Sequence, residues 1–144
     1  MPSPLGVALI GTGRVGYQFS FSDLPDNHAE AVTANPRTQL VAGVNRGREK
    51  LDVFGQRFGV SALFHDLGQM LQEARPDICI IATHPELHAQ MVAECAAAAT
   101  VKAIICEKPM ALSLAECDEM IDVCARHSVL LQINHNRRWH AEWQ

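Results

Sequence analysis

The chain has 144 residues, of which 48% are hydrophobic and 19% charged, and its formal net charge is −4. This length suits about one domain, and the apolar fraction supports a packed core, so the composition excludes a disordered chain. A pI near 5.9 argues against nucleic acid as a partner, and no apolar run approaches the length of a membrane span. The N-terminal residues lack the charged and apolar regions of a signal peptide. We therefore expect a cytoplasmic globular protein that binds neither nucleic acid nor membrane.

A glycine motif follows directly on the apolar run Val7–Ile10, which predicts a buried parallel strand. Gly11, Gly13 and Gly16 fall where this strand must turn into a helix, in the order G-x-G-x-x-G. Gly11 allows a tight turn, Gly13 lets a dinucleotide pyrophosphate approach the backbone, and Gly16 allows close helix–strand packing. The alternative is a glycine-rich turn in some other α/β domain.

Apolar runs and helical patterns then alternate along the chain. Asp66 is a predicted N-cap, and Ser113 with Glu116 forms a predicted capping box. Further strands are predicted at 39–44, 62–64, 77–82, 103–106 and 129–133, and helices at 49–58, 67–73, 86–98 and 113–126. The five cysteines form no C-x-x-C pair, and most sit in apolar runs, so they are predicted to be small buried hydrophobes in a reducing compartment. The fold class is therefore α/β, a doubly wound parallel (Rossmann) sheet of about six strands.

Polar residues gather at the predicted carboxyl ends of the strands, where an open parallel sheet binds its ligands. Burial of the strands does not require them, so their clustering predicts a binding edge. They are Gly11–Gly16, Asn45-Arg46, Thr83-His84, Glu107-Lys108-Pro109 and Asn134-His135-Asn136.

Four of these segments carry a family resemblance. Glu107-Lys108-Pro109 resembles the E-K-P segment of the glucose–fructose oxidoreductase and inositol dehydrogenase (Gfo/Idh/MocA) family. The segments 83–88 and 134–139 resemble that family's loops after the fourth and sixth strands. With the glycine motif, the resemblance covers almost the whole chain.

The resemblance implies roles for these residues. Glu107 and Lys108 would face the nicotinamide and the substrate, and Lys108 would be catalytic, steadying or polarising the substrate oxygen. A cis peptide before Pro109 would aim Lys108 inward. The expected cofactor-binding residues are Gly11, Thr12, Gly13, Arg14, Val15, Gly16, Asn45, Arg46, Thr83, His84, His88, Glu107, Lys108 and Asn134.

The segment between Gly16 and His28 departs from the family pattern, in which a histidine-alanine pair follows soon after the third glycine. Pro25, Asp26 and Asn27 indicate a break, and Asn27 is a candidate N-cap for a fresh helix. We expect a short or kinked first helix, or an extra loop over the cofactor.

The end of the second strand is the other departure. Domains that are specific for NAD place Asp or Glu there, whereas this chain has Asn45 followed by Arg46. A neutral amide does not repel a 2′-phosphate, and Arg46 could pair with it, so NADP is favoured over NAD. The alternative is that Arg46 belongs to an ordinary solvated helix start.

Two further pairs stand at helical spacing. His84 and His88 lack a third ligand and the zincin order, so no metal is expected. Trp139 and Trp143 would form an apolar stripe that needs a partner surface.

The resemblance therefore implies that residues 1–136 form an NAD(P)-binding Rossmann domain and that residues 137–144 begin the connection to a substrate domain. The parent reaction would be hydride transfer between the nicotinamide and a sugar, cyclitol or related polyol, in an enzyme expected to form a homo-oligomer. Alone, the 144-residue chain is expected to be inactive. The alternative is a non-catalytic NADP(H)-binding sensor or regulatory module.

Overall fold

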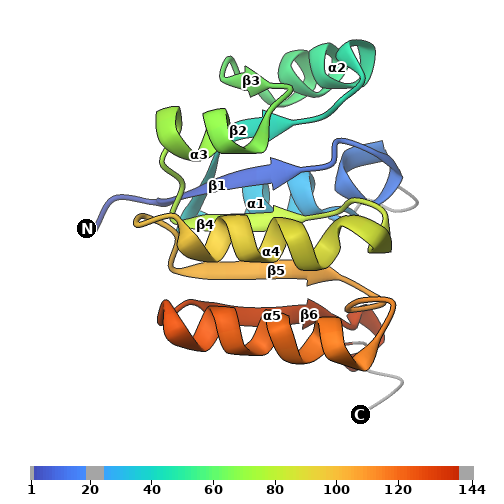
Figure 1. Ribbon diagram of the computed structural model, residues 1–144. Coiled ribbons are helices and arrows are strands. Elements are labelled where there is room, and N and C mark those ends of the chain that lie inside the picture. Colours follow the sequence, from blue (N-terminus) through green and yellow to red (C-terminus); the bar gives the residue numbers. More distant parts are fainter. Residues whose placement is uncertain (1, 19–24, 140–144) are drawn as a thin grey trace.

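A single parallel sheet organises the chain (Figure 1). The computed structural model describes residues 2–18 and 25–139. Its strands run in the order β3-β2-β1-β4-β5-β6, and every neighbouring pair is parallel. The strands are β1 (Leu5–Ile10), β2 (Thr38–Val44), β3 (Leu63–Phe64), β4 (Ile78–Ile81), β5 (Ala103–Glu107) and β6 (Leu130–Asn134). The order reverses between β1 and β4, so the predicted doubly wound sheet is confirmed.

The helices begin where the sequence places capping groups. The Asp66 side chain accepts a hydrogen bond from Gln69 N, and Ser113 and Glu116 close the predicted capping box. Gly59 ends α2 with φ of +68°, a left-handed conformation that glycine adopts without strain. The helices that follow β2 to β5 are α2 (Arg48–Phe58), α3 (Leu67–Glu73), α4 (His88–Ala97), preceded by the 3₁₀ turn η2 (Pro85–Leu87), and α5 (Leu114–Arg126). A last 3₁₀ turn, η3 (Asn136–Trp139), follows β6.

The connection after β1 departs from a continuous helix, as the sequence predicted. A π-helical turn, η1 (Arg14–Gln18), follows the glycines, and α1 (His28–Ala34) begins afresh after residue 27. The Asn27 side chain accepts a hydrogen bond from Glu30 N, which confirms its predicted role as N-cap. Residues 19–24 lie outside the described part of the chain.

Apolar side chains cover the sheet on both faces. Ala8, Ile10, Ile81 and Ile104 point toward α3, α4 and α5, which lie in front of the sheet in Figure 1. Val7, Leu9 and Ile80 point the other way, toward the core that includes Phe54 of α2 and Ala29 of α1. Burial on both faces explains why the strands are continuous apolar runs without alternation.

The cysteines are free thiols, and Cys79, Cys95, Cys106 and Cys124 are buried, as expected of small core residues. Burial raises the pKa of Cys106 to about 12, so this thiol stays protonated and acts as an apolar group. Within residues 2–18 and 25–139, no helix is long and apolar enough to cross a bilayer.

Candidate functional site

The glycine turn at the carboxyl end of β1 is held in a conformation that only glycine adopts without strain. Gly11 has φ of +94°, and a Cβ there would lie 2.5 Å from the carbonyl oxygen of Ala82. Its N–H donates to the carbonyl of Val44 at 2.9 Å, which fixes the turn between β1 and β2. Gly11 thus has the tight-turn role that the sequence predicted.

Gly13 and Gly16 have opposite surroundings. A Cβ on Gly16 would collide with the carbonyl oxygen of Gly11, which confirms the predicted close packing. A Cβ on Gly13 would meet no described heavy atom within 4 Å. The backbone at Gly13 is therefore open, as a pyrophosphate approaching this turn requires. Arg14, Val15 and Gly16 continue into η1, with Arg14 exposed.

The end of β2 places Asn45 beside the glycine turn. Its Nδ2 donates to Oγ1 of the buried Thr12 at 2.6 Å, and its Oδ1 accepts from Gly47 N at 3.1 Å. The Asn45 carbonyl also contacts Nδ1 of His65 at 2.8 Å. These bonds hold a neutral amide where domains specific for NAD place a carboxylate.

Arg46 lies next to Asn45 and is exposed, just before the start of α2. Arg48 is exposed as well, in an i, i+4 pair with Asp52 at 3.5 Å. Arg46 and Arg48 therefore follow the carboxyl end of β2 in the chain, and both residues are exposed.

Across the sheet, the end of β5 carries a buried carboxylate. Oε1 of Glu107 accepts hydrogen bonds from His28 Nε2 and Asn134 Nδ2, each at 2.7 Å. Oε2 of Glu107 accepts from the backbone N–H of Lys108 at 3.3 Å. Burial raises the pKa of Glu107, but the hydrogen bonds from His28 and Asn134 outweigh it, and the net pKa is below its ordinary value. The carboxylate is thus ionised at neutral pH.

Lys108 follows Glu107 at the same carboxyl edge as the glycine turn, as predicted, and its side chain is exposed. The Lys108-Pro109 peptide bond is cis, which confirms the sequence expectation.

The loop after β4 contributes residues of two kinds. Thr83 is half-buried and donates to Met91 Sδ at 3.4 Å, while His84 is exposed at the start of η2. His88 is fully buried, with Nδ1 3.0 Å from the carbonyl oxygen of Pro109 and Nε2 3.2 Å from that of Thr83. Its ring therefore joins the two loops rather than opening to solvent. Within the described residues, no group of three His, Cys, Asp or Glu side chains could hold a metal ion.

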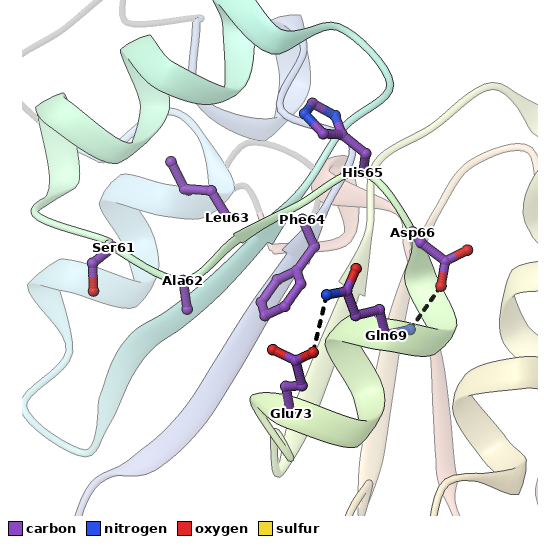
Figure 2. Close-up of a pocket in the computed structure, with 8 residues that line it drawn as sticks. All are labelled: Ser61, Ala62, Leu63, Phe64, His65, Asp66, Gln69 and Glu73. Carbon is purple, nitrogen blue, oxygen red and sulfur yellow. Dashed lines mark hydrogen bonds between the residues drawn. The ribbon is translucent and has the colours of Figure 1, made fainter.

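A separate hollow of about 430 Å³ lies at the β3 edge of the sheet (Figure 2). It is lined by Ser61, Ala62, Leu63, Phe64, His65, Asp66, Gln69 and Glu73. Gln69 donates to Glu73 at 2.9 Å within it. None of the predicted cofactor residues lines this hollow. Strand β2 separates β3 from β1, so the hollow is distinct from the glycine turn that follows β1.

The structure adds two histidines that the sequence analysis did not assign to the site. His28 reaches Glu107 across 79 residues of sequence, and His65 contacts the end of β2. The N-cap signal at Asn27 could have placed His28 at a helix start, but nothing in the sequence pairs it with Glu107. Trp143, the second residue of the predicted tryptophan stripe, lies outside the described residues.

The comparisons with known proteins identify the class. Residues 5–135 match the family model described as "Oxidoreductase family, NAD-binding Rossmann fold" (GFO_IDH_MocA). The chain therefore belongs to the Gfo/Idh/MocA family and forms its NAD-binding Rossmann domain.

Three individual relatives show how similar the chain is to known members of this family and how much of each it covers. D-apiose dehydrogenase from Paraburkholderia graminis is 38% identical over 113 residues, 78% of this chain and 30% of its own length. Myo-inositol 2-dehydrogenase from Lactobacillus plantarum aligns with a TM-score of 0.83 and 26% identity, over 96% of this chain and 38% of that one. The WlbA dehydrogenase from Bordetella pertussis, solved with NADH and UDP-GlcNAcA, aligns with a TM-score of 0.85 and 26% identity, over 98% and 40%. The chain thus spans well under half the length of these relatives.

Proposed function

We propose that this chain is the cofactor-binding part of an NAD(P)-dependent oxidoreductase that acts on a sugar, cyclitol or related polyol. The observation that carries the proposal is the open backbone at Gly13 on the same sheet edge as Glu107 and Lys108. Two of the relatives named above are dehydrogenases of D-apiose and of myo-inositol, which supports this substrate class. The nicotinamide would supply hydride transfer, and the protein would supply orientation and charge.

The segments along this sheet edge would bind different parts of the cofactor and the substrate. The N–H groups that follow Gly11 would bind the pyrophosphate, with Thr12, Arg14 and Val15 in the same turn. Thr83, His84 and His88 would shape the cofactor cleft through the loop after β4. Lys108 would place its ammonium against a substrate hydroxyl oxygen and stabilise the negative charge that develops there.

The end of β2 favours NADP over NAD in this proposal. Both polar ends of the Asn45 amide are engaged within the protein, and the group has no charge to repel a 2′-phosphate. Arg46 would pair with that phosphate, since a guanidinium forms two parallel hydrogen bonds to phosphate oxygens.

Calorimetric titration of the chain with NADP(H) and NAD(H) tests binding. We expect Gly13→Val to abolish binding of both, because the added methyl groups fill the open space beside the backbone. The fold should tolerate them, so the melting temperature of Gly13→Val is the control. Retained binding in the folded variant would contradict the proposed site.

Arg46→Ala tests the cofactor preference. This variant should weaken the binding of NADP(H) by about tenfold, or about 1.4 kcal/mol, and leave the affinity for NAD(H) within about twofold of the wild type. Arg126→Ala, which removes the same charge from the far end of α5, is the matched control. Equal weakening of both cofactors by Arg46→Ala would reject the phosphate contact.

We propose further that the 144-residue chain by itself binds cofactor without oxidising polyols, and that the full enzyme is a homo-oligomer. General acid–base catalysis is worth about 10²–10⁴ in rate, and no complete acid–base pair is assigned in the described residues. Reduction of NAD⁺ and NADP⁺ against a panel of sugars and cyclitols measures this. A coding sequence that continues past codon 144 into a substrate domain would favour the enzyme over a cofactor-sensing module.

A further inference from the structure

The cluster of Glu107, His28 and Asn134 joins three elements that are distant in sequence. Glu107 ends β5, Asn134 ends β6 and His28 opens α1. The Glu107 residue is 8% exposed, and the His28 side chain is 13% exposed. Two donors converge on a single carboxylate oxygen at 2.7 Å each, so the carboxylate has a fixed position.

The charge at this position is retained despite burial. An isolated buried carboxylate would be neutralised, because desolvation disfavours the charged form. The hydrogen bonds from His28, Asn134 and Lys108 N keep Glu107 ionised instead, as its lowered pKa indicates. A charge in a poorly solvated position acts over a longer distance than one in water.

The topology places this charge on one half of the predicted cofactor site. A doubly wound sheet binds one mononucleotide over each half, on either side of the point where the strand order reverses. The end of β2 belongs to the adenosine half by the chemistry of Asn45 and Arg46. Glu107 and Asn134, at the ends of β5 and β6, then belong to the nicotinamide half.

We propose that Glu107, held by His28 and Asn134, makes the site favour the oxidised over the reduced cofactor. This inference rests on the proposed function. The oxidised nicotinamide ring has a positive charge that the reduced ring lacks, so a fixed carboxylate nearby attracts only the oxidised form. The residue would thus set the position of the redox equilibrium on the protein, a role separate from that of Lys108.

The test compares four ligands by titration at one fixed pH. NAD⁺, NADH, NADP⁺ and NADPH are each bound to the wild-type chain and to Glu107→Gln. We expect the variant to lower the affinity ratio of oxidised to reduced cofactor by about tenfold, almost entirely through weaker binding of the oxidised form. Glu119→Gln, which removes an exposed carboxylate from α5, is the matched control and should leave the ratio unchanged.

ADP-ribose, which lacks the nicotinamide ring, controls for folding and separates the two proposals. Glu107→Gln should bind ADP-ribose as the wild type does. If Glu107→Gln does not fold, the double variant His28→Gln/Glu107→Gln is used instead, because it pairs two neutral amides. It should show the same fall in the affinity ratio of oxidised to reduced cofactor. A ratio within twofold of wild type in either folded variant, or an equal change in Glu119→Gln, would overturn the inference. Failure of the wild type to bind any dinucleotide or ADP-ribose would instead overturn the proposed function.

Discussion

At the scale of single residues, the glycines of one short motif have different tasks. Gly16 lies against the carbonyl oxygen of Gly11, whereas Gly13 faces open space. We predict that Gly16→Ala lowers the free energy of unfolding by about 1–3 kcal/mol, because backbone must move to admit the methyl group. Gly13→Ala should change it by less than about 0.5 kcal/mol. Urea denaturation of both variants measures the difference, and equal effects would mean that the packing at Gly16 is relaxed without cost.

Residue contacts show which parts of the site could be predicted from sequence. The glycines, Asn45, Glu107 and Asn134 could be placed at one edge because each follows a recognisable strand. The bond from Asn45 to Thr12 and the bond from His28 to Glu107 could not be predicted. The first depends on side-chain rotamers. The second depends on where α1 begins after the segment that follows Gly16, and that start position sets which side chain reaches β5.

At the scale of elements, Asp77 joins the start of β4 to its neighbouring strands. It accepts from Gly6 N at 2.8 Å and from Lys102 Nζ at 2.6 Å. The hydrogen bond from Lys102, and then that from Gly6, lowers the pKa of Asp77. A carboxylate with a lowered pKa in the folded state stabilises the fold above its unfolded pKa of about 4, and this contribution is lost as pH falls through the lowered value.

Asp77→Asn should therefore cost up to about 1 kcal/mol of unfolding free energy at pH 7, since the amide still accepts from Gly6 but loses the ion pair. The difference from wild type should begin to shrink as pH falls below about 4 and should vanish only below the lowered pKa of the folded state, where the carboxyl is protonated in both states. Denaturation at a series of pH values measures it. Asp118→Asn on the exposed face of α5 is the control, and a difference that does not depend on pH would exclude the ionised carboxylate as the cause.

Tyr17 connects η1 to α2. Its ring packs against Phe54 and Phe58 at centroid distances of 5.7 and 6.1 Å, and it is 3% exposed. We predict that Tyr17→Ala costs about 3 kcal/mol or more, as large-to-small changes in a core do. Tyr17→Phe should cost less than about 1 kcal/mol, because it loses only two long hydrogen bonds of the hydroxyl, the 3.3 Å bond to the carbonyl of Lys50 and the 3.4 Å bond from Gln18 Nε2. Urea denaturation distinguishes the two, and similar losses would show that the hydroxyl, not the ring, holds η1 in place.

Most elements could be predicted because two-sided burial leaves an unambiguous apolar run. The strands β4 and β5 match their predicted ranges closely, with Ile81 and Ile104 fully buried. The π-helical form of η1 could not be predicted, and neither could the packing of the Tyr17 ring against Phe54 and Phe58 of α2. Local sequence pattern contains no signal for a contact of that kind.

At the scale of the whole molecule, the helical layers cover the sheet unequally. In front, α3, α4 and α5 extend to β6, and Leu131 and Ile133 pack into that core. On the opposite face, the described core side chains reach only as far as Ile105 of β5. Leu130, whose register partner is Ala103, is 63% exposed. The sheet thus has an apolar position near its β6 edge that the described helices do not cover.

We expect the purified 144-residue chain to self-associate through this surface, because an apolar side chain on an edge strand is a common site of association. A net charge of −4 gives only weak repulsion against it. Leu130→Thr replaces leucine with a β-branched residue that suits a strand and removes apolar area, so it should shift the mass measured by light scattering toward the monomer at equal concentration. Leu114→Thr on α5, which is 83% exposed, is the matched control and should shift it less. A wild-type chain that remains monomeric at every concentration would contradict this prediction, and equal shifts in both variants would place the contact on α5 instead.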